Sequence, residues 1–148
     1  MLMRGVRLGL HIEPVEFQSG GIRLEGLVFV PDRVLGPGLV VCHGFDSRGF
    51  RGSELFELMA KRACEVGFVC LVFDFRGCGR SEGSFGYGWG EQTDLEAAIN
   101  YLLGRSEVQG DWVFVVGHSL GGAVGLYVAE RDKRVRAVAL WAVPHDHW

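Results

Sequence analysis

The sequence contains no long hydrophobic run. Its longest uninterrupted apolar stretch is seven residues, 137–143, whereas a helix that crosses a membrane needs about 20. Residues 1–11 carry two arginines but neither a sustained apolar segment nor a small-residue cleavage site, so the sequence predicts no secretory signal. Neither a membrane span nor export is expected.

Dense positive charge is also lacking. The chain has 15 Lys and Arg against 18 Asp and Glu, a net charge of −3, and its basic residues form no cluster. Proteins that bind nucleic acid present a basic patch to the phosphate backbone. The sequence therefore argues against nucleic acid as a partner.

Paired cysteine motifs are absent as well. None of the four cysteines stands in a C-x-x-C spacing. Cys42, Cys64 and Cys70 lie inside apolar segments, where a reduced and buried thiol is usual. The cysteines therefore favour a cytoplasmic location.

The chain does contain enough apolar sequence for one domain. Its 148 residues, 48% of them hydrophobic, fit a single domain over 1–148. Strands are expected at 12–17 and 22–30, joined by a hairpin turn at 19–21. Further strands are then expected at 39–42, 68–73, 112–116 and 135–143, and helices after Ser53, from Thr93 and over 120–130.

This alternation of strands and helices indicates the fold class. Strands that are apolar on both faces predict an α/β fold with a mostly parallel sheet and helices on both faces. The first helix is expected to carry Leu55, Met59, Arg62/Ala63 and Val66 on one face and to end at Gly67. A capping-box pattern at 93–96 is expected to begin the second helix. In such sheets, chemistry gathers at the carboxyl ends of the strands.

Residues 117–121 (Gly-His-Ser-Leu-Gly) follow one of these strands and precede a helix. They match G-x-S-x-G in the strand–turn–helix context that this motif requires. Ser119 would occupy a strained turn, which Gly117 and Gly121 permit because they lack bulk. The N-terminus of the next helix would then lie near the hydroxyl. The alternative is a glycine-rich turn in which Ser119 caps the helix.

Residues 43–45 (His-Gly-Phe) follow the strand at 39–42. A tetrahedral intermediate needs two donors for its oxyanion. The amide of Leu120 would be one and the amide of Phe45 the other, with Gly44 keeping the loop slim. The side chain of His43 is expected to hydrogen-bond to backbone within the turn.

Together with residues 74–81 (Asp-Phe-Arg-Gly-Cys-Gly-Arg-Ser), these motifs resemble the α/β-hydrolase superfamily, and in particular its small serine esterases and lipases. The resemblance implies a nucleophile at Ser119, oxyanion donors at Phe45 and Leu120, and transfer of an acyl group from a small ester to water. It also implies a structural loop in which Asp74 and Arg76 make hydrogen bonds. A dinucleotide-binding G-x-G-x-x-G would need glycine at position 82, which is Glu82.

In this family the catalytic acid and histidine follow the serine in the chain. Three interpretations therefore stay open. The chain is the N-terminal portion of a longer hydrolase, lacking the last strands and cap of the fold. Alternatively, the tail supplies the acid and base, with Asp146, His145 and His147 as candidates. In the third interpretation, the chain is a non-catalytic binding or assembly module.

The strand from Val135 to Val143 and the tail after it suggest two further expectations. An apolar strand at the edge of a sheet invites pairing, so we expect self-association or a complementing chain there. His145, Asp146 and His147 cluster, but no cysteine or third histidine is placed to complete a metal site. No metal and no cofactor are predicted.

Overall fold

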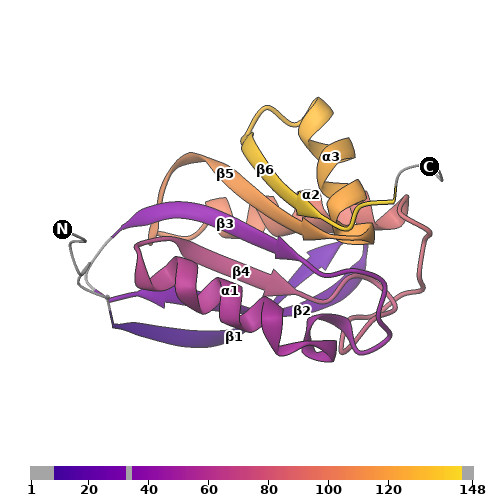
Figure 1. Cartoon of the computed structure of the whole chain (residues 1–148), viewed down its shortest axis with the longest axis horizontal. Coiled ribbons are helices and arrows are strands. Elements are labelled where there is room, and N and C mark those ends of the chain that lie inside the picture. The colour runs from indigo at the N-terminus through magenta and orange to yellow at the C-terminus, as the bar shows by residue number, and fades with distance from the viewer. Residues whose placement is uncertain (1–8, 33–34, 145–148) are drawn as a thin grey trace.

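The computed structural model describes residues 9–32 and 35–144 (Figure 1). The elements, in chain order, are β1 (Leu10–Ser19), β2 (Ile22–Pro31), β3 (Gly36–Cys42), the 3-10 turn η1 (Gly49–Gly52), α1 (Glu54–Glu65), β4 (Val69–Phe73), α2 (Gly90–Leu103), β5 (Val108–His118), α3 (Leu120–Arg131) and β6 (Val135–Trp141).

The strands form one sheet in the order β1-β2-β4-β3-β5-β6. β1 and β2 pair antiparallel around a turn at Gly20 and Gly21, both of which have positive φ, as hairpin turns of this kind require. β2 joins β4 antiparallel, whereas β4, β3, β5 and β6 run parallel. The predicted hairpin and the predicted mostly parallel sheet are both confirmed.

Helices cover both faces of the sheet, as predicted (Figure 1). α1 packs on one face against β4, β2 and β3, while α2 and α3 pack on the other face. On the α1 side the buried core includes Phe56, Ala60 and Cys64 with Val41 and Val72. The core under α2 and α3 is larger and includes Leu71, Leu95, Ile99, Val115 and Val124.

The buried face of α1 differs from the predicted one. Phe56, Ala60 and Cys64 are buried, at a spacing of four residues, whereas Leu55 is 45% and Val66 73% exposed. The two small residues let the helix lie close to the sheet, and Phe56 fills the space at its N-terminal end. Helical spacing alone placed Leu55 and Val66 on the inner face, whereas Ala63 of the predicted face does pack against this core.

The start of α2 also differs. The helix begins at Gly90, so the predicted capping box from Thr93 is wrong. The buried carboxylate of Glu91 accepts hydrogen bonds from the N–H groups of Gly86 and Gly88, at 2.7 and 2.8 Å, and thereby organises the chain before the helix. Asp94, within the helix, instead binds Arg76.

The longest helix of the described residues is α2, with 14 residues. No helix of the described residues combines the length and the apolar character needed to cross a membrane. All four cysteines are buried as free thiols. Burial raises the pKa of the Cys64 and Cys78 thiols to about 11, so they stay protonated at neutral pH.

Candidate active site

Ser119 lies at the carboxyl end of β5, next to the carboxyl end of β3. The two strands are parallel neighbours, and Cys42 pairs with Gly117 in their register. A Cβ atom added to Gly44 would lie 3.2 Å from Cβ of Ser119. The structure therefore brings the loop after β3 against the turn that carries the serine.

The backbone of Ser119 is in a conformation that side chains rarely adopt, with φ 50° and ψ −117°. This is the strained strand-to-helix turn predicted from the sequence. The side chain makes no capping hydrogen bond to α3, so the alternative of a plain helix cap is wrong. The backbone N–H of Ser119 donates to the carbonyl of Trp141, at the end of β6, at 3.1 Å.

Two glycines allow this turn to pack. A Cβ at Gly117 would lie 2.6 Å from the carbonyl oxygen of Gly121, and a Cβ at Gly121 would lie 2.5 Å from the carbonyl oxygens of Cys42 and His43. Real Cβ atoms essentially never approach that closely. Any other residue at either position would push α3 away from β5 or β3, as the sequence predicted.

The two amides predicted as oxyanion donors have no hydrogen-bond partner among the described residues. Leu120 is the first residue of α3, where a backbone N–H has no acceptor inside its own helix. Phe45 lies in the loop after β3. Within residues 9–32 and 35–144, no hydrogen bond from either N–H is present. Both N–H groups therefore lie without an acceptor in the described part of the chain, on the two segments that meet at Ser119.

His43 is fully buried and held by backbone on both ring nitrogens. Its Nε2 accepts the N–H of Phe75 at 3.0 Å, and its Nδ1 lies 2.5 Å from the carbonyl oxygen of Gly44. Because Nε2 accepts, the ring proton lies on Nδ1, which donates to Gly44. Burial lowers the pKa of His43, so the ring is neutral. It cannot serve as a base at Ser119, and the expected backbone hydrogen bonding is confirmed.

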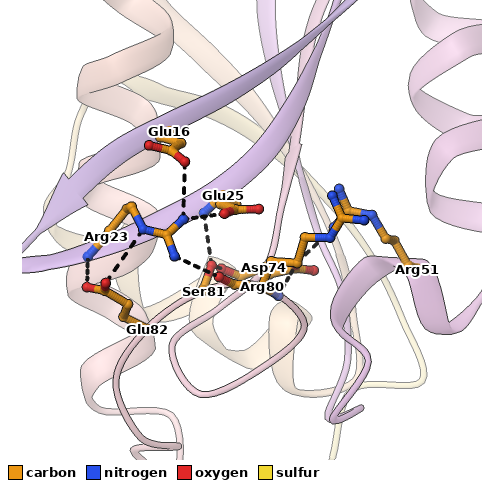
Figure 2. A network of polar contacts seen from close by, with 8 residues as sticks. All are labelled: Glu16, Arg23, Glu25, Arg51, Asp74, Arg80, Ser81 and Glu82. Carbon is orange, nitrogen blue, oxygen red and sulfur yellow. Dashed lines mark hydrogen bonds and ion pairs between the residues drawn. The ribbon is translucent and has the colours of Figure 1, made fainter.

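A polar network fastens the loop after β4 (Figure 2). The buried Asp74 accepts hydrogen bonds from the N–H groups of Phe50 and Arg80, at 2.9 and 3.0 Å. It also forms an ion pair with Arg51 at 3.0 Å. Burial raises the pKa of Asp74, and these hydrogen bonds act against that rise. The hydroxyl of Ser81 donates to the carbonyl of Asp74 at 2.6 Å.

The far end of the same loop is fixed to the hairpin. Figure 2 shows Arg23, on β2, surrounded by the carboxylates of Glu16, Glu25 and Glu82. The N–H of Arg23 also donates to Glu82 at 2.9 Å. The loop is thus held at both ends, which agrees with the structural role that the family resemblance implies.

A cleft of about 290 Å³ opens beside the serine turn. Its apolar walls include Phe45, Leu55, Phe56 and Trp141, and His118 lines it next to Ser119. The ring of His118 lies 5.1 Å from that of Trp141. Sequence reasoning missed Phe56 and Trp141. The parallel register, which pairs His118 with Trp141, is the signal that could have placed Trp141 there.

The candidates for acid and base, His145, Asp146 and His147, lie outside the described residues and stay predictions. Within the residues that the structure does describe, no side chain hydrogen-bonds to the hydroxyl of Ser119. The structure therefore assembles the serine, the two amides and the cleft, and it assigns no base.

Comparison with known proteins identifies the family. Residues 37–148 match the model of a family described as the alpha/beta hydrolase fold. The chain belongs to the α/β-hydrolase family. Among curated relatives, it is 33% identical over 128 residues to the quorum-quenching protein AidA of Acinetobacter baumannii and 32% identical over 130 residues to thiohydrolase apmlB of Arthrinium phaeospermum. The alignments cover 84% and 85% of this chain but 41% of each relative. The chain thus spans about two fifths of their length.

Solved structures show the same partial coverage. The α/β hydrolase GrgF from a Penicillium species superimposes with a TM-score of 0.78 at 29% identity, over 88% of this chain and 45% of that one. XC6422 of Xanthomonas campestris, described as a serine hydrolase without a lid, gives a TM-score of 0.79 at 25% identity, over 93% of this chain and 64% of that one. The resemblance drawn from the three motifs is confirmed, and the chain covers part of the fold of these structures.

Proposed function

We propose that this chain carries the nucleophilic half of a serine hydrolase that cleaves carboxylic esters. The observation that carries the proposal is the strained turn at Ser119. Its hydroxyl caps no helix, and the two segments that meet there leave the Phe45 and Leu120 amides unused. Strain of this kind persists only where the surrounding structure holds it, and it concentrates at functional sites.

In the proposed reaction, Ser119 Oγ attacks the ester carbonyl while its proton passes to a base. The amides of Phe45 and Leu120 hold the oxyanion, the alcohol leaves with a proton, and water then releases the acid from the acyl-enzyme. The base comes from the tail, with His145 and His147 as candidates and Asp146 as the acid, or from a chain that completes the fold.

The residues that line the cleft favour an uncharged, apolar substrate. Phe45, Leu55 and Trp141 give it apolar walls, and Asp46 is the acidic residue that lines it. Asp46 is paired with Arg48 at 2.9 Å. Among the described lining residues, a negatively charged acyl group would meet this carboxylate and no lysine or arginine, so a simple aliphatic or aromatic ester is the better fit.

Hydrolysis of p-nitrophenyl butyrate tests the proposal. Turnover by the 148-residue chain should disappear in Ser119→Ala and persist in Ser106→Ala, a matched substitution at an exposed serine before β5. A fluorophosphonate that reacts with activated serines provides the second readout. Labelling at Ser119 without turnover would show an activated serine whose acyl-enzyme this chain alone does not hydrolyse. A folded protein that shows neither turnover nor labelling would contradict the proposal and favour a binding module.

We also propose that β6 pairs with a further chain, either a second copy or a complementing polypeptide. β6 has β5 as its one neighbour in the described sheet. α3 packs against one of its faces. On the other face, Ala137 and Ala139 are exposed beside the half-buried Phe114 and Val116. An open strand edge next to uncovered apolar surface favours pairing.

Sedimentation over a range of concentrations tests this pairing. Ala139→Lys should abolish self-association, while Leu126→Lys, on the exposed side of α3, should leave it unchanged. A monomer at every concentration would rule out self-association and leave a complementing chain as the candidate.

We further propose a cytoplasmic location, which the four buried free thiols support.

A further inference from the structure

The carbonyl of Gly44 and the N–H of Phe45 belong to one peptide group. In a trans peptide these two bonds point in opposite directions. Whatever fixes the carbonyl therefore also fixes where the N–H points. The carbonyl of Gly44 receives the hydrogen bond from Nδ1 of the buried His43 ring.

We propose that His43 is a positioning residue that sets the direction of the Phe45 N–H toward the oxyanion. This inference rests on the proposed function, because it assigns a role to a donor of that reaction. His43 acts through the peptide group between residues 44 and 45 and does not touch the substrate.

The loop needs such a restraint because position 44 must be glycine. A Cβ there would lie 2.7 Å from Nδ1 of His118 and 3.2 Å from Cβ of Ser119. Glycine avoids this clash, but it is the residue whose adjoining peptide groups rotate most freely. The hydrogen bond from His43 replaces the restraint that a side chain would have supplied.

The ring of His43 is itself firmly placed. It is fully buried and packs 5.1 Å from the ring of Phe75 and 6.4 Å from the ring of Phe56. The N–H of Phe75 donates to Nε2 at 3.0 Å, so only the neutral tautomer with its proton on Nδ1 satisfies both contacts. A carbonyl that accepts such a bond also polarises its own peptide group, which makes the N–H a better donor.

Two substitutions separate this role from a general structural one. His43→Asn places an amide N–H where Nδ1 stands, which keeps the donor to Gly44 and loses the acceptor for Phe75. His43→Gln places an amide oxygen near the position of Nε2, which keeps the acceptor and loses the donor. Each variant removes one of the two hydrogen bonds, so their losses of thermal stability should be similar.

The readout is the second-order rate at which a fluorophosphonate labels Ser119. His43→Asn should stay within about threefold of the unchanged chain. His43→Gln should react about 10- to 100-fold more slowly, below the loss that follows removal of an oxyanion donor altogether. Equal rates in the two variants, or a slower rate in His43→Asn, would overturn the proposal.

The carbonyl ¹³C resonance of Gly44 gives a readout that does not depend on Ser119. It should move in His43→Gln and stay near its original position in His43→Asn. If the unchanged chain fails to label, the proposed function fails, and this resonance still decides whether His43 sets the peptide. An unmoved resonance in His43→Gln would overturn the positioning role even if labelling succeeds.

Discussion

Strands β4 and β6 are both rich in apolar residues, although β6 also contains Arg136, and their surroundings are opposite. All five residues of β4 are buried between β2 and β3, whereas β6 contains no fully buried residue and forms the edge of the described sheet. The serine turn follows β5, which lies between the inner strand β3 and the edge strand β6. An apolar strand sequence thus indicates that the side chains of the strand need to be buried. The neighbouring strands and helices decide whether they are.

Matched leucines provide the strongest test of this contrast. Leu71→Ala in β4 should lower the free energy of unfolding by about 4 kcal/mol, because it leaves a cavity in a fully buried core. Leu140→Ala in the half-buried β6 should cost about 1 kcal/mol, because the site can collapse or take up water. Urea unfolding of both variants measures the difference, and equal losses would show that β6 is as well covered as β4.

Two glycines of α3 give the next largest effect. Gly121→Ala should destabilise the chain by about 3 kcal/mol, because the new methyl group meets the carbonyls of Cys42 and His43 at 2.5 Å. In Gly125→Ala the nearest atom, on Val115, is 3.3 Å away, and the better helix propensity of alanine offsets a cost of about 1 kcal/mol. Thermal unfolding ranks the two variants, and a tolerated Gly121→Ala would contradict the close packing at the serine turn.

The loss of stability in mild acid should be the smallest of these effects. We expect it to originate at a buried group in the centre of the molecule. Burial keeps the pKa of His43 below 6.5 despite the carboxylates of Asp74, Asp46 and Glu91, which raise it. The unfolded chain therefore binds a proton near pH 6.5 that the folded chain does not. Stability should fall by about 1 kcal/mol as the pH drops from about 6.5 to about 5.5.

Urea unfolding across this pH range checks that expectation. His43→Asn should lose this part of the pH dependence, because no imidazole remains to titrate. His11→Asn, at an exposed ring, should retain it. A pH dependence that persists unchanged in His43→Asn would assign the effect to another group.

The sequence predicted the parts of the site that depend on local pattern. The strained turn at Ser119 and the tight glycines beside it follow from G-x-S-x-G in its strand–turn–helix context. The backbone role of His43 was also predicted. Each of these depends on residues within a few positions of one another or on the ends of neighbouring parallel strands.

Features that depend on tertiary packing were missed. Phe56 was not expected on the buried face of α1, because helical spacing favoured the face with Leu55 and Val66. Spacing does not measure how closely a helix can approach a sheet. The capping box at Thr93 failed because Glu91 and the ion pair between Arg76 and the buried Asp94 organise the start of α2. Predicting the cleft would have required both the register of β6 and the position of α1 on the sheet.

The hydrogen bond from the N–H of Ser119 to the carbonyl of Trp141 joins the reactive turn to the edge strand. Pairing at β6, if it occurs as we propose, would therefore be coupled to the backbone geometry at Ser119, and such a coupling is reciprocal. Under the pairing that we propose, a chain bound at β6 would alter the reactivity of the hydroxyl, and a reagent bound at the hydroxyl would alter the affinity of β6 for that chain by the same factor.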